Sequence, residues 1–573
     1  MSVKSEQVSC RFRHWTLLAV FALGFAALLW RAVDLQVIDQ GFLQGQADAR
    51  HLRVVAITAH RGRILDRNGE ALAASTPVDT VWANPQELLP AAEYLPSLAA
   101  ILDLRPERLR QLLSSRSDRE FIYLRRHVKP GVATQVRELA APGVYLLREY
   151  RRYYPDGEVA AHVVGFTDID DNGQEGLELA YDDWLRGEPG AKRVLKDGRR
   201  NIIEDVERIR AARPGKDLQL SIDRRIQYLA YRELKTAVLK HDARSGSAVV
   251  LDAVTGEVLA MVNQPSFNPN KRQHNKPAQI RNRAVTDVFE PGSTMKPFAV
   301  AAGLVSGKWR PDTLIDTAPG FMRVGHDTVR DVHNYGELDV AGVIRKSSNV
   351  GVSKIALSLE PEAFWSLLNG CGFGQVTASG FPGEAAGWLA NAHGWRPIEQ
   401  ATLAFGYGVS VTPLQLAKAY SVFANAGKIR PVTFLKVDQP APAWSVMPAE
   451  VARSVRHMME AVVKPGGTAP LARVSGYRVA GKTGTVRKSV AGGYADDRYR
   501  AVFAGMAPAS KPRLVVVVMI DEPRNKDYYG GKVAGPVFSR IMSGALRFMN
   551  LPPDGLDEKQ PVMRQAKAGA GAA

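Results

Sequence analysis

A serine and a lysine stand three positions apart in the segment FEPGSTMKPF, residues 289–298. Proline is tolerated only in the first turn of a helix, so Pro297 predicts a helix that begins at or just after Ser293. Ser293 and Lys296 are then neighbours on one helical face. A serine hydroxyl becomes nucleophilic when a base takes its proton, and a neutral lysine amine one turn away can be that base. The pair indicates serine chemistry without histidine, although one such tetrad arises by chance in a chain of this length.

Two further segments carry hydroxyl, amide and amine side chains at short spacing. They are Ser347 and Asn349 in KSSNVG, and Lys482, Thr483, Gly484 and Thr485 in AGKTGT, which is predicted to be a strand. Ser-x-x-Lys, Ser-x-Asn and Lys-Thr-Gly, in this order, form the motif set of penicillin-binding proteins and class A β-lactamases. The chain resembles that superfamily.

The elements that must position these motifs lie beyond ARPGKD, residues 212–217, where Pro214 and Gly215 interrupt the pattern. LQLSI is predicted to be a strand. The segment DRRIQYLAYRELKTAVLKH is predicted to be a helix capped by Asp223, and SAVVLDAVTGEVLAMVNQPSFNPN is predicted to be a hairpin that turns at 255–256. Three more strands are predicted near the C-terminus, and residues 293–470 are predicted to be largely helical. We therefore expect one antiparallel sheet covered by helices over residues 216–551, and an α+β fold. Residues 552–573 lack apolar periodicity and are predicted to be disordered.

Residues 45–215 mix short strands with turns and contain no catalytic constellation. Asn68-Gly69, between apolar-rich flanks, predicts a hairpin with a type I′ turn. His162 lies in no cluster of Cys, His and Asp at metal spacing, so the sequence predicts no metal site, and no cofactor is expected.

The N-terminal segment from Trp15 to Val33 is apolar apart from Arg31 and is long enough to span a bilayer core. Basic residues precede it and acidic residues follow it. The positive-inside rule therefore leaves residues 1–14 in the cytoplasm and exports the rest. A cleaved signal peptide is the rival interpretation, because Gly24-Phe25-Ala26 is similar to a cleavage site. The apolar run continues past that point, which favours an uncleaved anchor.

The charge and the cysteines add little about function. The 75 basic and 58 acidic residues give a net charge of +17, but the basic residues are scattered and no nucleic-acid fingerprint accompanies them. We expect no nucleic-acid partner. Cys10 precedes the predicted anchor and Cys371 lies far beyond it, so the membrane would separate the two thiols. Cys371 is predicted to be a small buried residue.

The resemblance extends over nearly the whole chain. The anchor, RGRILDRNG, FEPGSTMKPF and FGYGVSVTPLQLAKAYSVFANAGK together resemble a class B penicillin-binding protein, and within that class the division-specific transpeptidases, the FtsI or penicillin-binding protein 3 type. This implies a membrane anchor, a non-catalytic pedestal (dimerisation-type) domain at 45–215 and a β-lactamase-like, penicillin-recognising transpeptidase domain. It also implies covalent attack on peptidoglycan stem peptides that end in D-Ala-D-Ala, and on β-lactam antibiotics.

The resemblance implies a role for each motif residue. Ser293 would attack the carbonyl of the penultimate D-Ala, with Lys296 as base. Ser347 and Lys482 would relay a proton to the leaving amine, and Asn349 would hydrogen-bond the substrate amide. Thr483 and Thr485 would bind the terminal carboxylate, and Gly484 would let the strand approach the extended peptide. The backbone NH groups of Ser293 and Thr485 would form the oxyanion hole.

The family also has an aromatic wall around the site, which is matched here by Tyr407, Tyr499, Tyr528 and Tyr529. Ordinary, partly buried tyrosines are the alternative interpretation. Arg487 is a further candidate for carboxylate binding. The chain departs from many division enzymes in having Lys-Thr-Gly where those carry Lys-Ser-Gly, and the extra methyl group bears on which β-lactams fit.

The resemblance implies that the chain sits in the bacterial inner membrane with a periplasmic catalytic domain. Its implied partners are an FtsW-type glycosyltransferase and other divisome proteins. Four alternatives stay open: a β-lactamase, a bifunctional class A protein, an elongation-type class B transpeptidase, and a non-catalytic β-lactam-binding scaffold. The anchor and the first region count against the β-lactamase. No glycosyltransferase motif is found in residues 45–215.

Overall fold

The computed structural model describes residues 4–38, 52–196, 202–271, 276–490 and 493–555. The chain forms two compact units, and the smaller comprises residues 1–60 and 187–215. It contains the helix α1 (Lys4–Val33), the π-helical turn η1 (Asp34–Ile38) and an antiparallel sheet in the order β1-β8-β9. These strands span Leu52–Ile57, Gly190–Lys196 and Ile202–Arg210.

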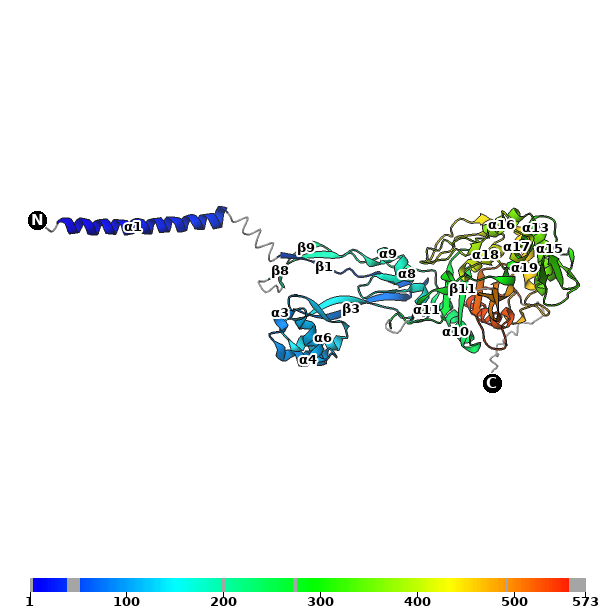
Figure 1. The fold of residues 1–573 in the computed structure, drawn as a ribbon, viewed down its shortest axis with the longest axis horizontal. Coiled ribbons are helices and arrows are strands. Elements are labelled where there is room, and N and C mark those ends of the chain that lie inside the picture. The colour runs from blue at the N-terminus through cyan, green and yellow to red at the C-terminus, as the bar shows by residue number, and fades with distance from the viewer. Residues whose placement is uncertain (1–3, 39–51, 197–201, 272–275, 491–492, 556–573) are drawn as a thin grey trace, which may run out of the picture. The chain divides into compact units, whose positions relative to one another are not determined.

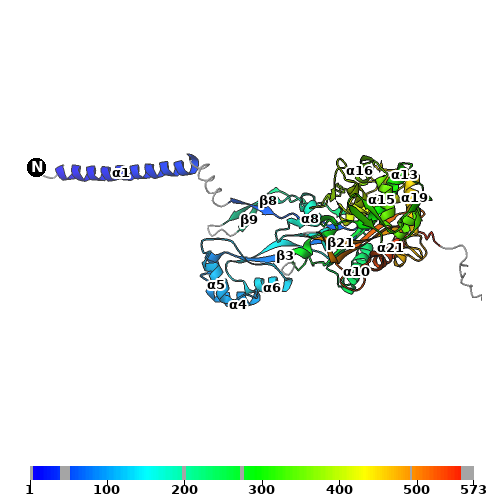
Figure 2. The same ribbon diagram turned by 45° about the vertical axis from the view of Figure 1, so that its right-hand side comes forward.

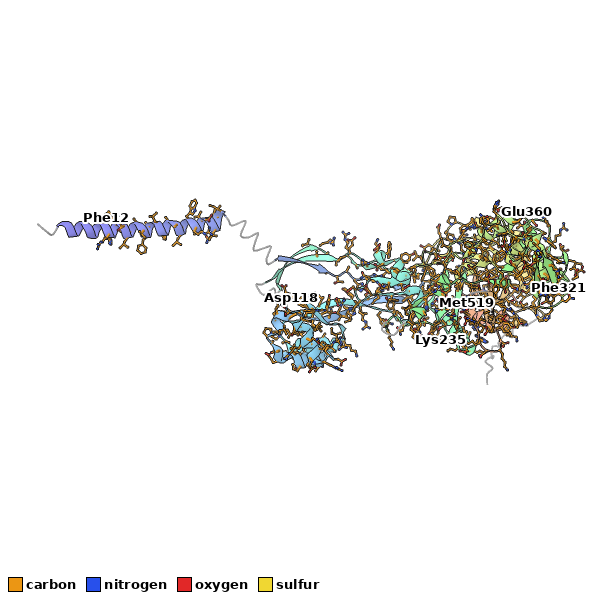
Figure 3. The ribbon with its side chains drawn as sticks, viewed as in Figure 1. Phe12, Asp118, Lys235, Phe321, Glu360 and Met519 are labelled. Carbon is orange, nitrogen blue, oxygen red and sulfur yellow. The ribbon has the colours of Figure 1, made fainter. Side chains whose placement is uncertain are left out.

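Helix α1 has the length and composition of a membrane-spanning segment. Within Phe12–Ile38 the most apolar 18-residue window has a mean hydropathy of 2.0, and none of that window is buried. Apolar side chains such as Phe12, which is 71% exposed, project into open space around the helix (Figure 3). An apolar helix with no protein around it is compatible with a lipid environment.

The larger unit comprises residues 61–186 and 216–573. Its first part has a sheet of β2 (Ile64–Leu65), β3 (Ala71–Ala83), β4 (Ile122–Val128), β5 (Val144–Tyr153) and β10 (Leu218–Gln219). One side of this sheet buries a small apolar core with the helices α4 (Leu95–Ile101), α5 (Pro106–Ser114) and α6 (Pro130–Leu139).

The hairpin predicted at Asn68-Gly69 is present, because β2 pairs with β3 in antiparallel register. Its turn is not of type I′, however. Gly69 has a φ of +90°, whereas Asn68 is not among the residues with positive φ, and Gly69 N–H donates to the carbonyl of Asp66 at 3.1 Å. The turn residues are tied by the Asp66 carboxylate, which accepts from the backbone NH groups of Asn68 and Glu70. This side-chain cap supports a longer loop in which only the glycine needs a left-handed conformation.

The second part of the larger unit is built on one five-stranded antiparallel sheet in the order β12-β11-β23-β22-β21. The strands are β11 (Ser245–Asp252), β12 (Val258–Gln264), β21 (Ala480–Val490), β22 (Gly493–Ala507) and β23 (Leu514–Asp521). Every residue of β11, β12 and β23 is buried, so helices cover both faces of these strands. The predicted sheet and the α+β class are confirmed.

Two helices far apart in sequence pack together on one face of this sheet. They are α10 (Arg224–Lys240), capped by Asp223 as predicted, and α21 (Gly535–Phe548). A Cβ at Gly544 would lie 2.3 Å from Leu229 Cδ2, so only glycine allows α21 to approach α10 this closely. Figure 2 draws α10, α21 and β21 in this region.

The opposite face is covered by α18 (Pro413–Ala424), which contacts β11, β22 and β23 and is buried along its whole length. The helices that surround it are grouped in Figure 1. They are α13 (Lys296–Val305), α14 (Val340–Lys346), α15 (Asn349–Leu357), α16 (Pro361–Gly370), α17 (Pro397–Leu403) and α19 (Ala449–Glu460). Helices are therefore present in residues 293–470 as predicted, but the region also contains unpredicted two-stranded sheets, such as β13 (Leu314–Asp316) with β16 (Glu337–Asp339).

Two segments differ from expectation. LQLSI contributes only the two-residue strand β10, which pairs in parallel with β2 and not with the five-stranded sheet. In the predicted disordered tail, Asp554 accepts hydrogen bonds from the backbone NH groups of Arg478 and Ser510 at 2.8 and 2.9 Å. Residues 552–555 are therefore ordered, and residues 556–573 lie outside the described residues.

Candidate active site

Ser293 lies on a tight turn that leads into α13. It belongs to the 3₁₀ turn η4 (Gly292–Met295), and the α-helix proper begins at Lys296 with Pro297 in its first turn. The α-helix therefore starts three residues after Ser293, later than predicted, because the turn that carries the Ser293 hydroxyl is 3₁₀. Gly292 has a φ of +56°, and a Cβ there would lie 2.3 Å from Val486 Cγ2 on β21. Glycine therefore lets this turn sit directly against the strand.

The structure brings both motif lysines to one hydroxyl. Lys296 Nζ lies 3.1 Å from Ser347 Oγ, and Lys482 Nζ lies 2.9 Å from the same atom. Lys296 Nζ also donates to Asn349 Oδ1 at 2.7 Å and to the Ser347 carbonyl. Both lysine side chains are fully buried, whereas Ser293 and Ser347 are half-buried. The amine of Lys296, the hydroxyl of Ser347 and the amine of Lys482 form a continuous hydrogen-bonded line.

Burial explains why these amines can lose their protons. Desolvation, reinforced by the charge of Lys482, lowers the pKa of Lys296 well below its ordinary value, and Asp331 opposes that effect. Desolvation also lowers the pKa of Lys482, to about 7. A charge is costly in a site from which water is excluded, so the neutral amine is favoured. The site therefore contains two amines whose neutral form is favoured by burial, and Lys482 can serve as a base near neutral pH.

Asp331 also belongs to the site, although no sequence motif predicted it. Its carboxylate accepts from Ser348 Oγ at 2.6 Å and from the backbone NH groups of Val350, at 3.1 Å, and Asn349. Asn349 Nδ2 in turn donates to the carbonyl of Arg330 at 2.8 Å. A carboxylate at the N-terminus of α15 is stabilised by the free NH groups there. Asp331 thus holds the Ser-x-Asn segment beside Lys296.

The Lys-Thr-Gly segment lies on β21 against the turn that carries Ser293. A Cβ at Gly484 would lie 2.9 Å from the Pro291 carbonyl oxygen, so a side chain there would push the strand away from the turn. Thr483 Oγ1 lies 2.9 Å from Thr468 Oγ1, and Thr485 Oγ1 accepts from Gly530 N–H at 2.9 Å. Both threonine hydroxyls are therefore held by neighbouring segments.

The predicted aromatic residues fall into two sets of ring contacts. Tyr499 stacks on Tyr528, with ring centroids 4.2 Å apart, and Tyr528 stacks on Tyr529 at 4.5 Å. Tyr407 instead meets Tyr494 edge to face at 5.3 Å. Tyr494 was not singled out from sequence, because a tyrosine beside glycines carries no motif.

Arg487 lies close to the motif strand but is tied to a neighbour. Its guanidinium is 3.3 Å from Asp496 Oδ1, and both side chains are more than half exposed. An exposed pair of this kind is weak and exchanges with solvent, so the arginine can turn to another carboxylate.

Glu290, three residues before Ser293, joins three segments around that serine. Its Oε1 accepts from Gly408 N–H and from the hydroxyl of Tyr494, each at 3.0 Å. The neighbouring Phe289 pairs with Val411 through two backbone hydrogen bonds of 2.9 Å. Glu290 therefore fixes the loop after Tyr407 and the start of β22 to the segment that carries Ser293. A carboxylate next to the Ser-x-x-Lys motif was the only available sequence signal.

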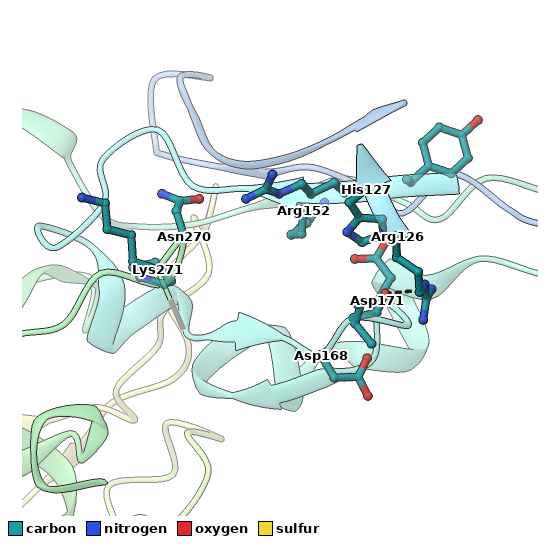
Figure 4. A pocket seen from close by; sticks show the side chains of 11 residues that line it. Arg126, His127, Arg152, Asp168, Asp171, Asn270 and Lys271 are labelled. Carbon is teal, nitrogen blue, oxygen red and sulfur yellow. Dashed lines mark hydrogen bonds between the residues drawn. The ribbon is translucent and has the colours of Figure 1, made fainter. Parts of the chain in front are cut away.

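Large hollows do not mark the motif residues. The pocket in Figure 4 lies where β4 and β5 approach the 168–171 and 269–271 segments and has a volume of about 560 Å³. Asn270 and Lys271 lie on one side of it, and Asp168 and Asp171 on the other.

Among the described residues, no group of three or more His, Cys, Asp and Glu side chains is placed to hold a metal ion. Cys371 is buried, and this raises the pKa of its thiol.

Comparison with known proteins agrees with this architecture. Residues 246–543 match the penicillin binding protein transpeptidase domain, and residues 56–220 match the penicillin-binding protein dimerisation domain. The peptidoglycan D,D-transpeptidase FtsI of Escherichia coli K12 is 42% identical over 579 residues, which cover 99% of this chain and 98% of that protein. The probable peptidoglycan D,D-transpeptidase PenA of Neisseria meningitidis serogroup B is 44% identical over 555 residues, covering 96% and 95%.

A solved structure is also similar. It is the transpeptidase domain of penicillin-binding protein 3 from Burkholderia pseudomallei, which is 47% identical. The alignment has a TM-score of 0.55 and covers 58% of this chain and 97% of that one. The match is confined to one domain, and this accounts for the smaller share of the present chain.

Proposed function

The chain belongs to the penicillin-binding proteins with a dimerisation and a transpeptidase domain, and from this premise we infer that it is a peptidoglycan D,D-transpeptidase. It crosslinks stem peptides in septal wall synthesis through a serine acyl-enzyme, and it is a covalent target of β-lactams. The observation that carries the proposal is the buried line from Lys296 through Ser347 to Lys482 beside the turn of Ser293.

In the proposed first step, neutral Lys296 takes the proton of Ser293 while Ser293 Oγ attacks the carbonyl carbon of the penultimate D-Ala. The carbon–nitrogen bond to the terminal D-Ala then breaks, and the leaving amine receives a proton through Ser347 and Lys482. An amine from a neighbouring stem attacks the resulting ester, forms the new amide and returns the proton to Ser293. The lowered pKa of Lys296 supports its role as base.

Substrate binding is assigned to the strand beside the nucleophile. Thr483, Thr485 and Arg487 bind the terminal carboxylate, Gly484 admits the extended peptide, and Asn349 binds a substrate amide. The backbone NH groups of Ser293 and Thr485 stabilise the oxyanion, a contribution of about 3–4 kcal/mol per donor in other acyl-transfer enzymes. The close approach of Gly484 to Pro291 supports this arrangement, since it sets the strand that carries Thr485 against the turn that carries Ser293. Tyr407, Tyr499, Tyr528 and Tyr529 line the entrance.

The remaining assignments concern the rest of the chain. Residues 1–14 are the cytoplasmic tail, 15–33 the transmembrane helix, 45–215 a non-catalytic pedestal and 216–551 the transpeptidase domain on the periplasmic side. The apolar helix α1 and the basic residues that precede it support this topology. An FtsW-type glycosyltransferase that makes the glycan strand, together with other divisome proteins, would act with the chain.

The test is labelling with a fluorescent penicillin. Membranes that contain the chain should show a labelled band of its mass, and Ser293→Ala should remove the label while the protein stays folded. If the folded native protein fails to label, Ser293 forms no acyl-enzyme with penicillin and the proposed mechanism is wrong.

A further inference from the structure

A second concave surface lies on the transpeptidase domain, away from the motif residues. It is formed by α10, α21 and the turn at 473–475, has a volume of about 720 Å³, and is called here the α10/α21 groove. Its walls are fixed, because α10 and α21 pack directly on each other at Leu229 and Gly544. These helices cover the face of the sheet opposite to α18. An occupant of the groove would therefore leave Ser293 accessible.

The groove carries a strong excess of positive charge. Five arginines line it but only one carboxylate, Glu233. The arginines, all with exposed side chains, are Arg225, Arg232, Arg473, Arg540 and Arg547. Five positive charges and one negative charge give these lining residues a net charge of +4.

The local carboxylates do not neutralise this set. Glu233 is shared by Arg232, at 2.8 Å, and Arg540. Arg225 pairs with Asp223 at 2.7 Å, just outside the groove. Arg473 and Arg547 have no carboxylate partner within the part of the chain that the structure describes. Arg547 Nε donates to the carbonyl of Ser543 at 3.3 Å, which leaves its terminal nitrogens available, with the Arg473 guanidinium, to an anionic ligand.

The pocket of Figure 4 provides a contrast, because its main arginines are already neutralised. Arg126 pairs with Glu149 at 2.8 Å and with Asp170 at 2.7 Å, and the fully buried Arg152 pairs with Glu178 at 2.7 Å. Asp168 and Asp171 add negative charge to its lining. Positive side chains alone therefore do not distinguish the α10/α21 groove. The excess of positive over negative side chains in its lining does, because the lining of the other pocket also includes Asp168 and Asp171.

The groove also exposes aromatic surface beside its arginines. Tyr228 is 54% exposed and Phe548 is 39% exposed, and the guanidinium of Arg225 lies 5.3 Å from the centre of the Phe548 ring. Arginine and aromatic side chains are enriched in protein–protein interfaces and in their hot spots. A flat lipid surface does not fit a trough between two helices, whereas a peptide segment does.

We propose that the α10/α21 groove docks an acidic polypeptide segment of a partner protein. Aspartate or glutamate side chains of that segment accept paired hydrogen bonds from Arg473 and Arg547, whose planar guanidinium groups match the geometry of carboxylates. Apolar side chains of the segment pack on Tyr228 and Phe548. Docking places the partner on the non-catalytic face of the domain, where it can be held during crosslinking.

The groove is also linked to the motif strand by a short stretch of chain. Thr468, five residues before Arg473, lies 2.9 Å from the hydroxyl of Thr483. Charge-reversing substitutions in the groove must therefore be checked for effects on acylation, and the penicillin label provides that check.

The test uses the full chain in detergent and fluorescein-labelled octaglutamate as the probe, with binding followed by fluorescence anisotropy at 150 mM salt. Arg473→Glu together with Arg547→Glu should weaken binding by tenfold or more, because both free guanidinium groups are removed. The matched control is Arg116→Glu with Arg119→Glu, two exposed arginines of the first part of the unit, which makes the same change in net charge. The control should change the affinity by less than twofold.

Several results would overturn the proposal. Equal weakening in the groove variant and the control would show that octaglutamate senses only net charge. Displacement of the probe by dioctanoyl phosphatidylglycerol or soluble muropeptides, at lower concentration than by unlabelled octaglutamate, would assign the groove to lipid or peptidoglycan. If the glutamate variant loses penicillin labelling, Arg473→Gln with Arg547→Gln replaces it. Unchanged probe binding in that labelled, folded variant would equally refute the proposal.

Discussion

Replacing Lys296 distinguishes two possible roles of its side chain, that of a general base and that of a positive charge alone. Lys296→Arg keeps the charge and the reach, but a guanidinium has no accessible neutral form. Lys296→Met removes both the charge and the base while keeping an unbranched side chain. If Lys296 takes the proton of Ser293, both substitutions should slow acylation. If it acts only through its charge, the arginine variant should stay active and the methionine variant should not.

The size of the effect follows from the position of the amine. A positioned general base contributes about 10²- to 10⁴-fold, so acylation should fall by at least about 10² in both variants. Lys296 is fully buried and desolvation lowers its pKa. A permanent charge at this position therefore has to be buried beside Lys482. We expect the arginine variant to lose about 1–3 kcal/mol of stability, which is a typical cost for an imperfectly paired buried group.

The assay is the second-order rate of labelling by a fluorescent penicillin, quenched at intervals and read on a gel. Thermal unfolding of each variant shows that the protein is folded at the assay temperature, and Ser293→Ala gives the background. The pH dependence adds a check. A base must be neutral, so the native rate should fall as pH drops through the lowered pKa of Lys296. Near-native labelling by Lys296→Arg, together with loss in Lys296→Met, would refute the base role.

Three further outcomes are expected. Because the pKa of Lys482 is lowered to about 7, the folded state resists protonation there while the unfolded state accepts it below 10.5. Lys482→Met should therefore raise the free energy of unfolding at pH 7 by up to about 5 kcal/mol, and this gain should shrink toward pH 10; a gain that grows with pH would contradict this. Glu290→Ala should slow labelling roughly tenfold, as two hydrogen bonds of about 1 kcal/mol each are lost, while Glu290→Gln, which keeps an acceptor, should restore most of the rate. Equal rates in the two variants would exclude this positioning role. Mass spectrometry of the membrane-extracted chain should find peptides that start at Met1 or Ser2, and a mature start near Ala27 would show that the anchor is cleaved.

Local patterns in the sequence were sufficient for the elements that depend on local chemistry. The cap at Asp223, the hairpin between β11 and β12 and the apolar N-terminal helix were all predicted, because capping, turn formation and hydropathy act over a few residues. The antiparallel sheet was also predicted, since strands at both ends of the region need partners and the helices between them need a surface to cover. The three motifs were recognised as a set from their types and order.

The short-range predictions that failed did so where a side-chain cap or a tertiary partner changed the local preference. The Asn68-Gly69 turn is closed by the carboxylate of Asp66 and not by two left-handed residues. LQLSI pairs with β2, 154 positions away, in the register pair of Ile64 and Leu218. Asp554 is held by backbone NH groups of two distant loops. No local window of sequence contains the partners of LQLSI and Asp554, whereas Asp66 stands two residues before Asn68.

The sequence by itself determined which side chains the site has, how they are spaced, and which segments carry them, because these follow from residue type and local period. Only the tertiary structure decided that Lys296 and Lys482, 186 positions apart, share the hydroxyl of Ser347. It also decided that both amines are buried, that Asp331 caps the helix beside them, and that Glu290 ties three segments together. The physical reason is that a pKa depends on desolvation and on neighbouring charges, and both are set by contacts between elements that are remote in the chain.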